Sequence, residues 1–407
     1  MTTTGVSMRE FRVAIIGAGL GGLALAQILS RNGVAFDVFE RDSAPDSRVQ
    51  GYRIRIDAEG QRALAAVLPP DLYALFRQTA SISATPGRFI TPQLEDVTRQ
   101  LPESWHTGEV PDEGEDLSVH RQTLREILMC GIEENIHFGC GFESYHLLED
   151  GSVEVVFDHA DPITFDVVIG ADGVNSRVRK QLAPGAEPDD TGAVCIYGKF
   201  SLELPEAPSL ASAGTSVVFA DGFSAIMDEM RFRDDLPAIA RSIAPDCALT
   251  SVGDYLYWAI IGPRDRIGHV FSHEIDAAVS AFDKTLSSLT AEWHPALRRI
   301  ITQSDPSTVV MLPVRSGHPE AEWASGPVTI LGDAAHAMSP AGGVGANTAL
   351  KDACALANAL VDAGRLRHRL THVIADYESV MRAWSISAVA VSNRGTERLL
   401  ETSKAPT

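Results

Sequence analysis

Three glycines near the start of the chain have the spacing of a phosphate-binding loop. The stretch "GAGLGG" places Gly17, Gly19 and Gly22 directly after residues 11–16, an apolar run with the length and branching of a buried strand. In such a loop the first glycine permits a tight turn, the second lets a pyrophosphate approach the backbone, and the third lets helix and strand pack closely. The N–H groups at the start of the following helix would then face the phosphates.

The segments around this loop predict a βαβ unit. Residues 23–30 have helical periodicity, Gly33 stands where a helix would stop, and residues 34–39 have the pattern of a second buried strand that ends at Glu40. An acid at that position can accept hydrogen bonds from the two hydroxyls of an adenosine ribose. This context predicts a dinucleotide site, although the motif alone does not separate NAD from FAD.

Two later segments also join an apolar strand to a loop of small residues. Residues 165–180, "FDVVIGADGVNSRVRK", carry Asp172, and residues 328–350, "VTILGDAAHAMSPAGGVGANTAL", carry Asp333 and a glycine-rich loop before a helix. The first is also compatible with an ordinary strand-to-turn junction. Three such junctions together predict one long, flat ligand, and a flavin with its ribityl chain fits. Asp333 would bond the ribityl hydroxyls, and the helix after Gly345 would stabilise negative charge on the flavin.

Four segments, taken in order, resemble the signature sequences of a known family. "GAGLGG…FER", "VHRQTLREIL", "VIGADGVNSRVR" and "LGDAAHAMSPAGGVGAN" are similar to those of the single-component FAD-dependent aromatic hydroxylases, which include p-hydroxybenzoate hydroxylase and the tetracycline-inactivating monooxygenase. The resemblance implies an α/β fold with a Rossmann-like FAD-binding domain, an inserted antiparallel-sheet substrate domain and a long C-terminal helix. We expect residues 1–80, 117–184 and 305–368 in the first domain, 81–116 and 185–304 in the second, and 369–407 in the helical segment.

The resemblance also implies roles for individual residues. Glu40 and Arg41 would hold the adenosine ribose, Arg121 the ribityl-phosphate region, and Asp172 would belong to the segment shared by FAD and the nicotinamide cofactor. Arg48 falls at a nicotinamide-cofactor contact and Arg55 at a flavin contact, where the tetracycline-inactivating enzyme has an acid. For Arg48, Arg53 and Arg55 a solvated basic patch is the other interpretation. The predicted cofactor-binding residues are Gly17, Gly19, Leu20, Gly22, Glu40, Arg41, Arg48, Arg55, Arg121, Asp172, Asp333, Pro340, Gly343, Gly345, Ala346 and Asn347.

The segment between the flavin motifs predicts the substrate-binding part. Residues 191–262 alternate apolar and polar positions, which predicts an antiparallel sheet, and the resemblance implies that this sheet roofs the flavin and holds the substrate. Residues 82–116, with several prolines and an acidic end, predict a solvated loop. The pocket candidates are Phe219, Phe223, Met227, Tyr257 and Trp258. An ordinary place in the core is the alternative for each of these side chains.

Composition and charge narrow the class of protein. The formal net charge of -20 argues against a nucleic-acid partner, because a phosphate backbone requires a basic face. The five cysteines have no C-x-x-C spacing, and no metal-ligand pattern is present. Residues 13–29 are apolar but are interrupted by glycines, so they do not predict a membrane span. We expect a cytoplasmic protein that is a monomer or a weak homodimer, with His336 in a structural role and no role assigned to His120.

The favoured function is an FAD-dependent monooxygenase. The resemblance implies that NADPH or NADH and O2 serve to hydroxylate or epoxidise an aromatic or polyketide-like molecule through a flavin hydroperoxide. Since one dinucleotide fingerprint is present, the nicotinamide cofactor should bind transiently. No catalytic side chain is predicted, because the cofactor carries the reaction. A flavin halogenase is disfavoured because "WAIIGP" lacks the second tryptophan of W-x-W-x-I-P. A non-redox FAD-containing cyclase or scaffold stays open.

Overall fold

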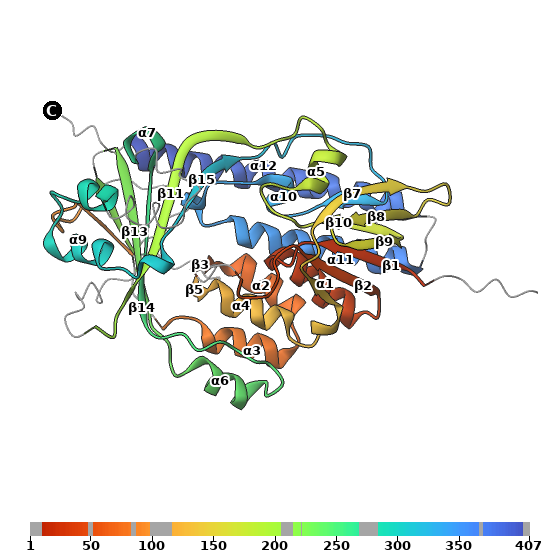
Figure 1. Ribbon diagram of the computed structural model, residues 1–407, viewed down its shortest axis with the longest axis horizontal. Helices are drawn as coiled ribbons and strands as arrows, with labels where there is room; N and C mark the ends of the chain where they lie inside the picture. The colour runs from red at the N-terminus through yellow and green to blue at the C-terminus, as the bar shows by residue number, and fades with distance from the viewer. Residues whose placement is uncertain are drawn as a thin grey trace, which may run out of the picture.

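The computed structural model describes residues 10–47, 52–82, 87–97, 116–204, 215–220, 222–267, 284–365 and 369–401. Figure 1 shows an α/β unit at one end and a long antiparallel sheet at the other, with one helix running along both. The predicted mixed α/β fold with a Rossmann-like part is confirmed. Arg48 and residues 109–115 of the predicted acidic loop lie outside the described residues.

A parallel sheet forms the centre of the α/β unit. It contains β1 (Arg12–Ile16), β2 (Ala35–Glu40), β6 (Ile136–Phe138), β10 (Val167–Gly170) and β16 (Val328–Ile330), in the order β16-β10-β1-β2-β6. All four strand pairs are parallel. β1 and β10 are apolar almost throughout because both faces of such a sheet are covered. The helix α1 (Leu20–Arg31) packs on α11 (Gly345–Arg365).

The topology brings the three predicted loops to one edge. In a parallel sheet, the loops after neighbouring strands leave from the same edge, which is where ligands bind. The loops after β1, β10 and β16 therefore meet, although about 310 residues separate the first from the last. This is the arrangement that the three strand-to-loop junctions predicted.

The second sheet has six strands and two different faces. It contains β15 (Val310–Ser316), β11 (Asp189–Ser201), β14 (Tyr255–Pro263), β13 (Phe223–Met230), β12 (Ser216–Ala220) and β4 (Arg88–Ile90), in that order. The pairs are antiparallel except for β4 with β12. One face packs with α9 (Pro295–Thr302) in an apolar core, and the opposite face turns toward the α/β unit.

The predicted domain boundaries differ from this sheet in two places. β15 follows residue 305, where we expected the FAD-binding domain to resume, but it pairs with β11 in the second sheet. Conversely, α6 (Leu236–Ile243) lies within the expected substrate domain but packs against α3 (Pro70–Thr79) in the core of the α/β unit. The predicted boundary at residue 305 therefore comes before β15, the last strand of the second sheet, and α6 is a segment that returns to the α/β unit between β13 and β14.

The helix α12 (Leu370–Glu401) joins the two parts. Near its start, Tyr377 donates a hydrogen bond to the Ile330 carbonyl of the parallel sheet. Near its end, the Leu399 carbonyl accepts one from Ser224 of β13. The predicted C-terminal helix is therefore present, and it contacts both sheets.

The remaining elements surround these layers. They are β3 (Arg53–Ile56), β5 (Leu117–His120), β7 (Phe142–Leu147), β8 (Val153–Phe157), β9 (Ala160–Phe165), α2 (Ala58–Val67), α4 (Arg121–Met129), α5 (Arg177–Leu182), α7 (Arg264–Ile267), α10 (Asp333–His336), η1 (Glu133–Asn135), η2 (Pro306–Thr308) and η3 (Pro340–Gly342). β3 and β5 pair between the two main parts. Within the described ranges, no helix has the length and apolar character needed to cross a membrane.

Candidate cofactor and substrate site

A cavity of about 380 Å³ lies between the two parts of the molecule. This volume is within the roughly 300–1,000 Å³ of small-molecule sites. One wall consists of the loops after β1, β10 and β16 together with the start of α11. The other wall is the inward face of β11, β13, β14 and β15, and β3 with Arg121 closes the space between them. The cavity therefore has a loop wall and a sheet wall.

The three glycines of the first loop have different surroundings. Gly17 has a φ of 109°, and a Cβ added there would lie 2.4 Å from the Ala171 carbonyl oxygen. A Cβ at Gly22 would lie 2.3 Å from the carbonyl oxygen of Gly17, so helix and strand pack tightly there. At Gly19 the nearest atom would be 4.0 Å away. Space for a ligand thus exists at Gly19, beside the start of α1, which has no side-chain cap.

Two acids lie beside these loops. The Glu40 carboxylate accepts hydrogen bonds from the N–H groups of Ala18 and Asp42, both at 3.0 Å, and stands next to the first loop. Asp172 accepts from the Arg177 N–H at 2.7 Å, which caps the start of α5. Its Oδ1 is buried and has no hydrogen-bond partner among the described residues. Glu40, Arg41 and Asp172 are not among the residues that line the cavity, and their contacts with a cofactor stay predictions.

Asp333 and Arg121 line the middle of the cavity. The Asp333 carboxyl opens into the cavity but has protein around it, and this burial raises its pKa, opposed by His336 and Arg121. Behind it, Asp352 accepts hydrogen bonds from the Gly332 N–H at 2.9 Å and from the Trp384 ring at 2.8 Å. Asp352 also pairs with the buried His336. These contacts fix the turn that carries Asp333, and they agree with a structural role for His336.

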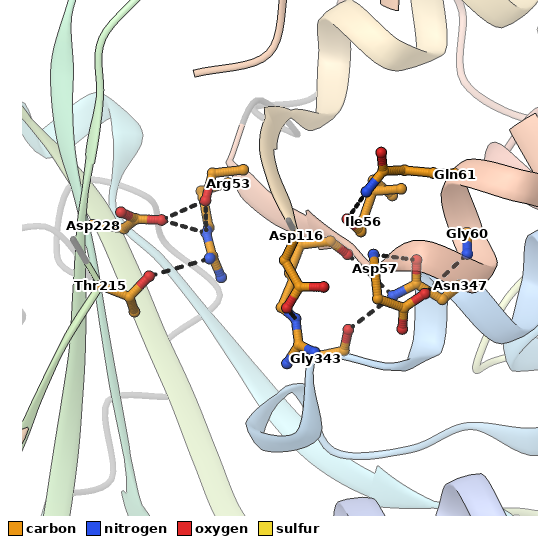
Figure 2. Close-up of polar contacts among 12 residues, drawn as sticks. Arg53, Ile56, Asp57, Gly60, Gln61, Asp116, Thr215, Asp228, Gly343 and Asn347 are labelled. Carbon is orange, nitrogen blue, oxygen red and sulfur yellow. Dashed lines mark hydrogen bonds and ion pairs between the residues drawn. The ribbon is translucent and has the colours of Figure 1, made fainter. Parts of the chain in front are cut away.

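The start of α11 contributes small residues to the loop wall. Pro340, Gly343, Gly345 and Ala346 all line the cavity, and the flavin contacts that the resemblance implied for them stay predictions. Asn347 does not line it. Its amide donates to the carbonyls of Arg55 and Gly343, both at 3.2 Å, and its oxygen accepts from the Asp57 N–H (Figure 2). Hydrogen bonds within the protein therefore occupy its side chain, and its predicted contact with the flavin stays a prediction.

The two arginines of β3 line the cavity, and each forms an ion pair with an aspartate. Arg53 lies 2.7 Å from Asp228, and Arg55 lies 2.6 Å from Asp116. Their side chains are only 15% and 20% exposed. The solvated basic patch is thus wrong for these two residues.

The sheet wall corrects three of the predicted substrate contacts. Phe223, Met227 and Trp258 point to the opposite face, into the core beneath α9. Phe223 stacks on Trp293 with ring centroids 5.8 Å apart, and the Trp258 N–H donates to Ser304 at 2.6 Å. Side chains alternate along a strand, so an error of one position moves a residue to the other face. Phe219 is on the inward side but stacks on Phe89 and does not line the cavity.

Tyr257 lines the cavity as expected, beside several residues that sequence reasoning missed. Those are Tyr52, Arg53, Cys195, Tyr197, Ile226, Ala259 and Ile261. A signal for this face was present in the alternation of β14, where Tyr255 and Tyr257 interleave with Leu256 and Trp258. The strand face whose rings carry hydroxyl groups is the one that faces the cavity.

These features fit one long dinucleotide. Open space at Gly19, an uncapped helix start and a buried carboxylate oxygen without a partner in the described chain lie along one edge of the parallel sheet. Fold and site thus define a dinucleotide-binding α/β protein with a second domain over the cofactor edge. Residues 15–77 match the family model of the NAD(P)-binding Rossmann-like domain, and residues 257–389 match that of the FAD binding domain.

Proteins of similar sequence indicate which dinucleotide-binding proteins this chain resembles. The chain is 34% identical to the dual O-methyltransferase/FAD-dependent monooxygenase CTB3 of Cercospora beticola over 95% of its own length and 46% of that protein. It is 26% identical to 6-hydroxynicotinate 3-monooxygenase of Pseudomonas fluorescens, over 94% and 91% of the two chains. The chain thus spans about half the length of the dual-function relatives.

Solved structures of flavin-dependent enzymes have the same fold as this chain. A chain named as an FAD-containing monooxygenase of Photorhabdus luminescens has a TM-score of 0.80 and 28% identity over 96% of this chain and 99% of that chain. A tetracycline destructase shares the fold, with a TM-score of 0.65 and 18% identity over 97% and 92%. In sequence and fold the chain resembles the FAD-dependent aromatic monooxygenases, and the resemblance predicted from its motifs is confirmed.

Proposed function

We propose that this chain is an FAD-dependent monooxygenase that hydroxylates or epoxidises an aromatic or polyketide-like small molecule. The observation that carries this proposal is the cavity between the two parts of the molecule, which has two unlike walls. One wall offers backbone groups and small residues to a dinucleotide, and the other offers aromatic and apolar side chains to a second ring. A cofactor and a substrate would therefore meet face to face in a space enclosed by protein.

The residues of the loop wall would bind and orient FAD. The start of α1 and the space at Gly19 suit the pyrophosphate, and Asp333 and Arg121 suit the ribityl chain. The start of α11 would place N–H groups and positive partial charge near the ring. When bound, FAD would supply hydride acceptance from the nicotinamide cofactor and activation of O2. The sheet wall would orient the substrate ring and exclude water.

NADPH or NADH would act as a transient co-substrate. The chain carries one G-x-G-x-x-G fingerprint, and the first loop that contains it would be occupied by FAD. The hydride donor must then approach the flavin through the open part of the cavity. We extend the proposal to a cytoplasmic protein that is a monomer or a weak homodimer and that has no nucleic-acid partner.

The names of relatives support the proposed substrate class. Three are dual O-methyltransferase/FAD-dependent monooxygenases, and another is 6-methylsalicylate 1-monooxygenase of Aspergillus terreus. An O-methyltransferase acts on a hydroxyl group, so the dual relatives handle oxygen-bearing molecules. We propose that this chain likewise acts on an oxygen-bearing aromatic molecule, and that its product has a hydroxyl that a methyl transferase can use.

The test is oxygen incorporation by the FAD-loaded protein. Candidate phenols and hydroxyquinones are first screened for faster oxidation of NADPH or NADH than the protein gives alone. With labelled O2, mass spectrometry of the product should find one labelled oxygen atom per molecule. A product that forms at full rate without O2 or nicotinamide cofactor would overturn the proposal in favour of a non-redox cyclase or scaffold.

A further inference from the structure

A second cavity, of about 250 Å³, lies beside the end of α4. Its lining residues are Pro45, Glu126, Met129, Cys130, Glu133, Ile136, Phe138, Asp246 and Ala248, and none of them lines the first cavity. Cys130 is half-buried, with part of its surface on this second cavity. A small molecule from solvent can therefore reach its thiol.

The fold brings a second cysteine, Cys247, against Cys130. The segment between α6 and β14 is bonded to α4, because Thr250 donates from its N–H at 2.9 Å and from its hydroxyl at 2.7 Å to the Glu126 carboxylate. Glu126 is one helical turn before Cys130, so both lie on the same face of α4. Both chain neighbours of Cys247 line the second cavity together with Cys130. The two cysteines thus meet although about 120 residues separate them in sequence.

Backbone hydrogen bonds hold both cysteines in place. The Gln27 amide donates to the carbonyls of Leu128 and Cys130, at 2.9 and 2.8 Å. The Cys247 N–H donates to the Ala244 carbonyl at 2.9 Å, and Cys247 is only 3% exposed. Cys130 is therefore the member of the pair that a molecule in the cavity meets first, and Cys247 lies behind it.

The contact between the two thiols also makes them chemically unequal. A hydrogen bond from the Cys247 thiol lowers the pKa of Cys130 below its usual 9.0, against the effects of burial and of nearby carboxylates. The same contact raises the pKa of Cys247. Burial raises the pKa values of Cys140, Cys195 and Cys354. Because the thiolate is the reactive form, Cys130 is the cysteine that should react first.

The charge of the second cavity favours an uncharged reagent. Its lining contains three carboxylates, those of Glu126, Glu133 and Asp246, and no basic side chain. Such a lining repels anions, which include anionic thiols such as glutathione. A small uncharged oxidant such as hydrogen peroxide is not repelled.

We infer that Cys130 and Cys247 are a peroxide-sensitive pair, and that their disulfide clamps the segment between α6 and β14 to α4. This inference goes beyond the proposed function and does not depend on it. The Cys130 sulfur attacks one oxygen of hydrogen peroxide, the O–O bond breaks and water leaves, which produces a sulfenic acid. The Cys247 sulfur then attacks the Cys130 sulfur, the S–O bond breaks, and a second water leaves with the Cys247 proton. Two thiols are oxidised to one disulfide, and one peroxide is reduced to two waters.

This disulfide connects the two parts of the molecule. α4 belongs to the α/β unit and begins at Arg121, which lines the first cavity. The segment that carries Cys247 leads into β14 of the sheet wall. A bond that closes a loop of about 120 residues restricts the unfolded chain and so stabilises the folded state.

The test maps cysteine oxidation in the folded protein. The purified protein is treated with hydrogen peroxide, its remaining thiols are alkylated, and its peptides are analysed by mass spectrometry without reduction. We expect a peptide pair joined through Cys130 and Cys247 that disappears after treatment with dithiothreitol. Cys130 should lose its thiol at least about tenfold faster than Cys140, which is also half-buried. Oxidation of Cys140 before Cys130, or oxidised Cys130 without a link to Cys247, would overturn the inference.

Variants separate the two steps. Cys247→Ser removes the second thiol, so peroxide should leave a sulfenic acid at Cys130 that dimedone traps. Cys130→Ser should leave the buried Cys247 unreacted at the same peroxide concentration. Cys140→Ser is the matched control and should form the cross-link as the unaltered protein does. A dimedone label on Cys247 in the first-cysteine variant, or none on Cys130 in the Cys247→Ser protein, would contradict the assigned order.

Thermal unfolding tests the clamp. The cross-linked protein should unfold about 5 °C above the reduced protein, and dithiothreitol should abolish the difference. Peroxide-treated Cys247→Ser protein cannot form the bond and should show no gain. Equal unfolding temperatures of the linked and reduced proteins would overturn the clamp. FAD content is measured on the same samples, since its absence would count against the proposed function while the cross-link still decides this inference.

Discussion

The two walls of the cavity are built from different parts of the amino acid. The loop wall presents backbone atoms, and its specificity depends on what is absent: a Cβ at Gly19 and bulk at Gly343, Gly345 and Ala346. The sheet wall presents side chains, and its specificity depends on which of two faces each residue occupies. The loop wall therefore tolerates almost no substitution, whereas the sheet wall can exchange rings while its strands keep the same hydrogen bonds.

Among the substitutions that test this difference between the walls, we expect the largest effect on FAD binding at Gly19. Gly19→Val would place a branched side chain in the open space beside the start of α1, and we expect the purified protein to lose FAD. Absorbance of the bound flavin measures this directly. Gly326→Val is the matched control, since a Cβ there meets no atom within 4 Å and lies outside the cavity. A Gly19→Val protein with a full complement of FAD would contradict the assignment of the first loop.

A second prediction separates the two faces of the sheet. Trp258 is fully buried on the outward face, and Trp258→Ala should lower the free energy of unfolding by about 3–5 kcal/mol, the usual cost of such a cavity. Because the ring does not reach the cavity, the FAD content of the folded protein should be unchanged. Denaturant titration measures the free energy of unfolding, and flavin absorbance measures the FAD content. Loss of FAD with unaltered stability would mean that the two faces are wrongly assigned.

The smallest expected effect concerns Lys199 of β11, which contacts β5. Its Nζ lies 3.1 Å from Nε2 of His120 in β5 and 4.7 Å from the centre of the Tyr255 ring. Burial lowers the pKa of its ammonium group from 10.5 to about 8. Between these values the unfolded chain binds more protons than the folded chain, so rising pH stabilises the folded state. We expect the unaltered protein to gain stability relative to Lys199→Met as pH rises from about 8 toward 10.5.

Thermal or denaturant unfolding of both proteins across this range measures that gain. Below pH 8 the difference between the two proteins should be constant. A difference that stays flat across the whole range would show that the folded state does not disfavour the charged lysine.

The loop wall was predictable from sequence because backbone geometry limits the residue type there. Only glycine adopts the φ of Gly17 at no steric cost next to Ala171, and Asp333 follows directly from its strand. The sheet wall was not predictable in the same way, since Trp258 and Tyr257 are neighbours with opposite directions. Tyr52 and Arg53 join the site only through the pairing of β3 with β5, a tertiary contact without a local signal.

The length of the helix α12 determines how the two walls of the cavity are aligned. Tyr377 and Trp384 are bonded to groups of the parallel-sheet side, and Asn393 and Leu399 are bonded to β15 and β13 of the second sheet. Each residue of an α-helix advances about 1.5 Å and turns by about 100°. One residue inserted between Trp384 and Asn393 would rotate the later contacts to a different side of the helix, so the two sets could not be kept together. The separation of the two cavity walls thus depends on the length of a helix that does not itself line the cavity.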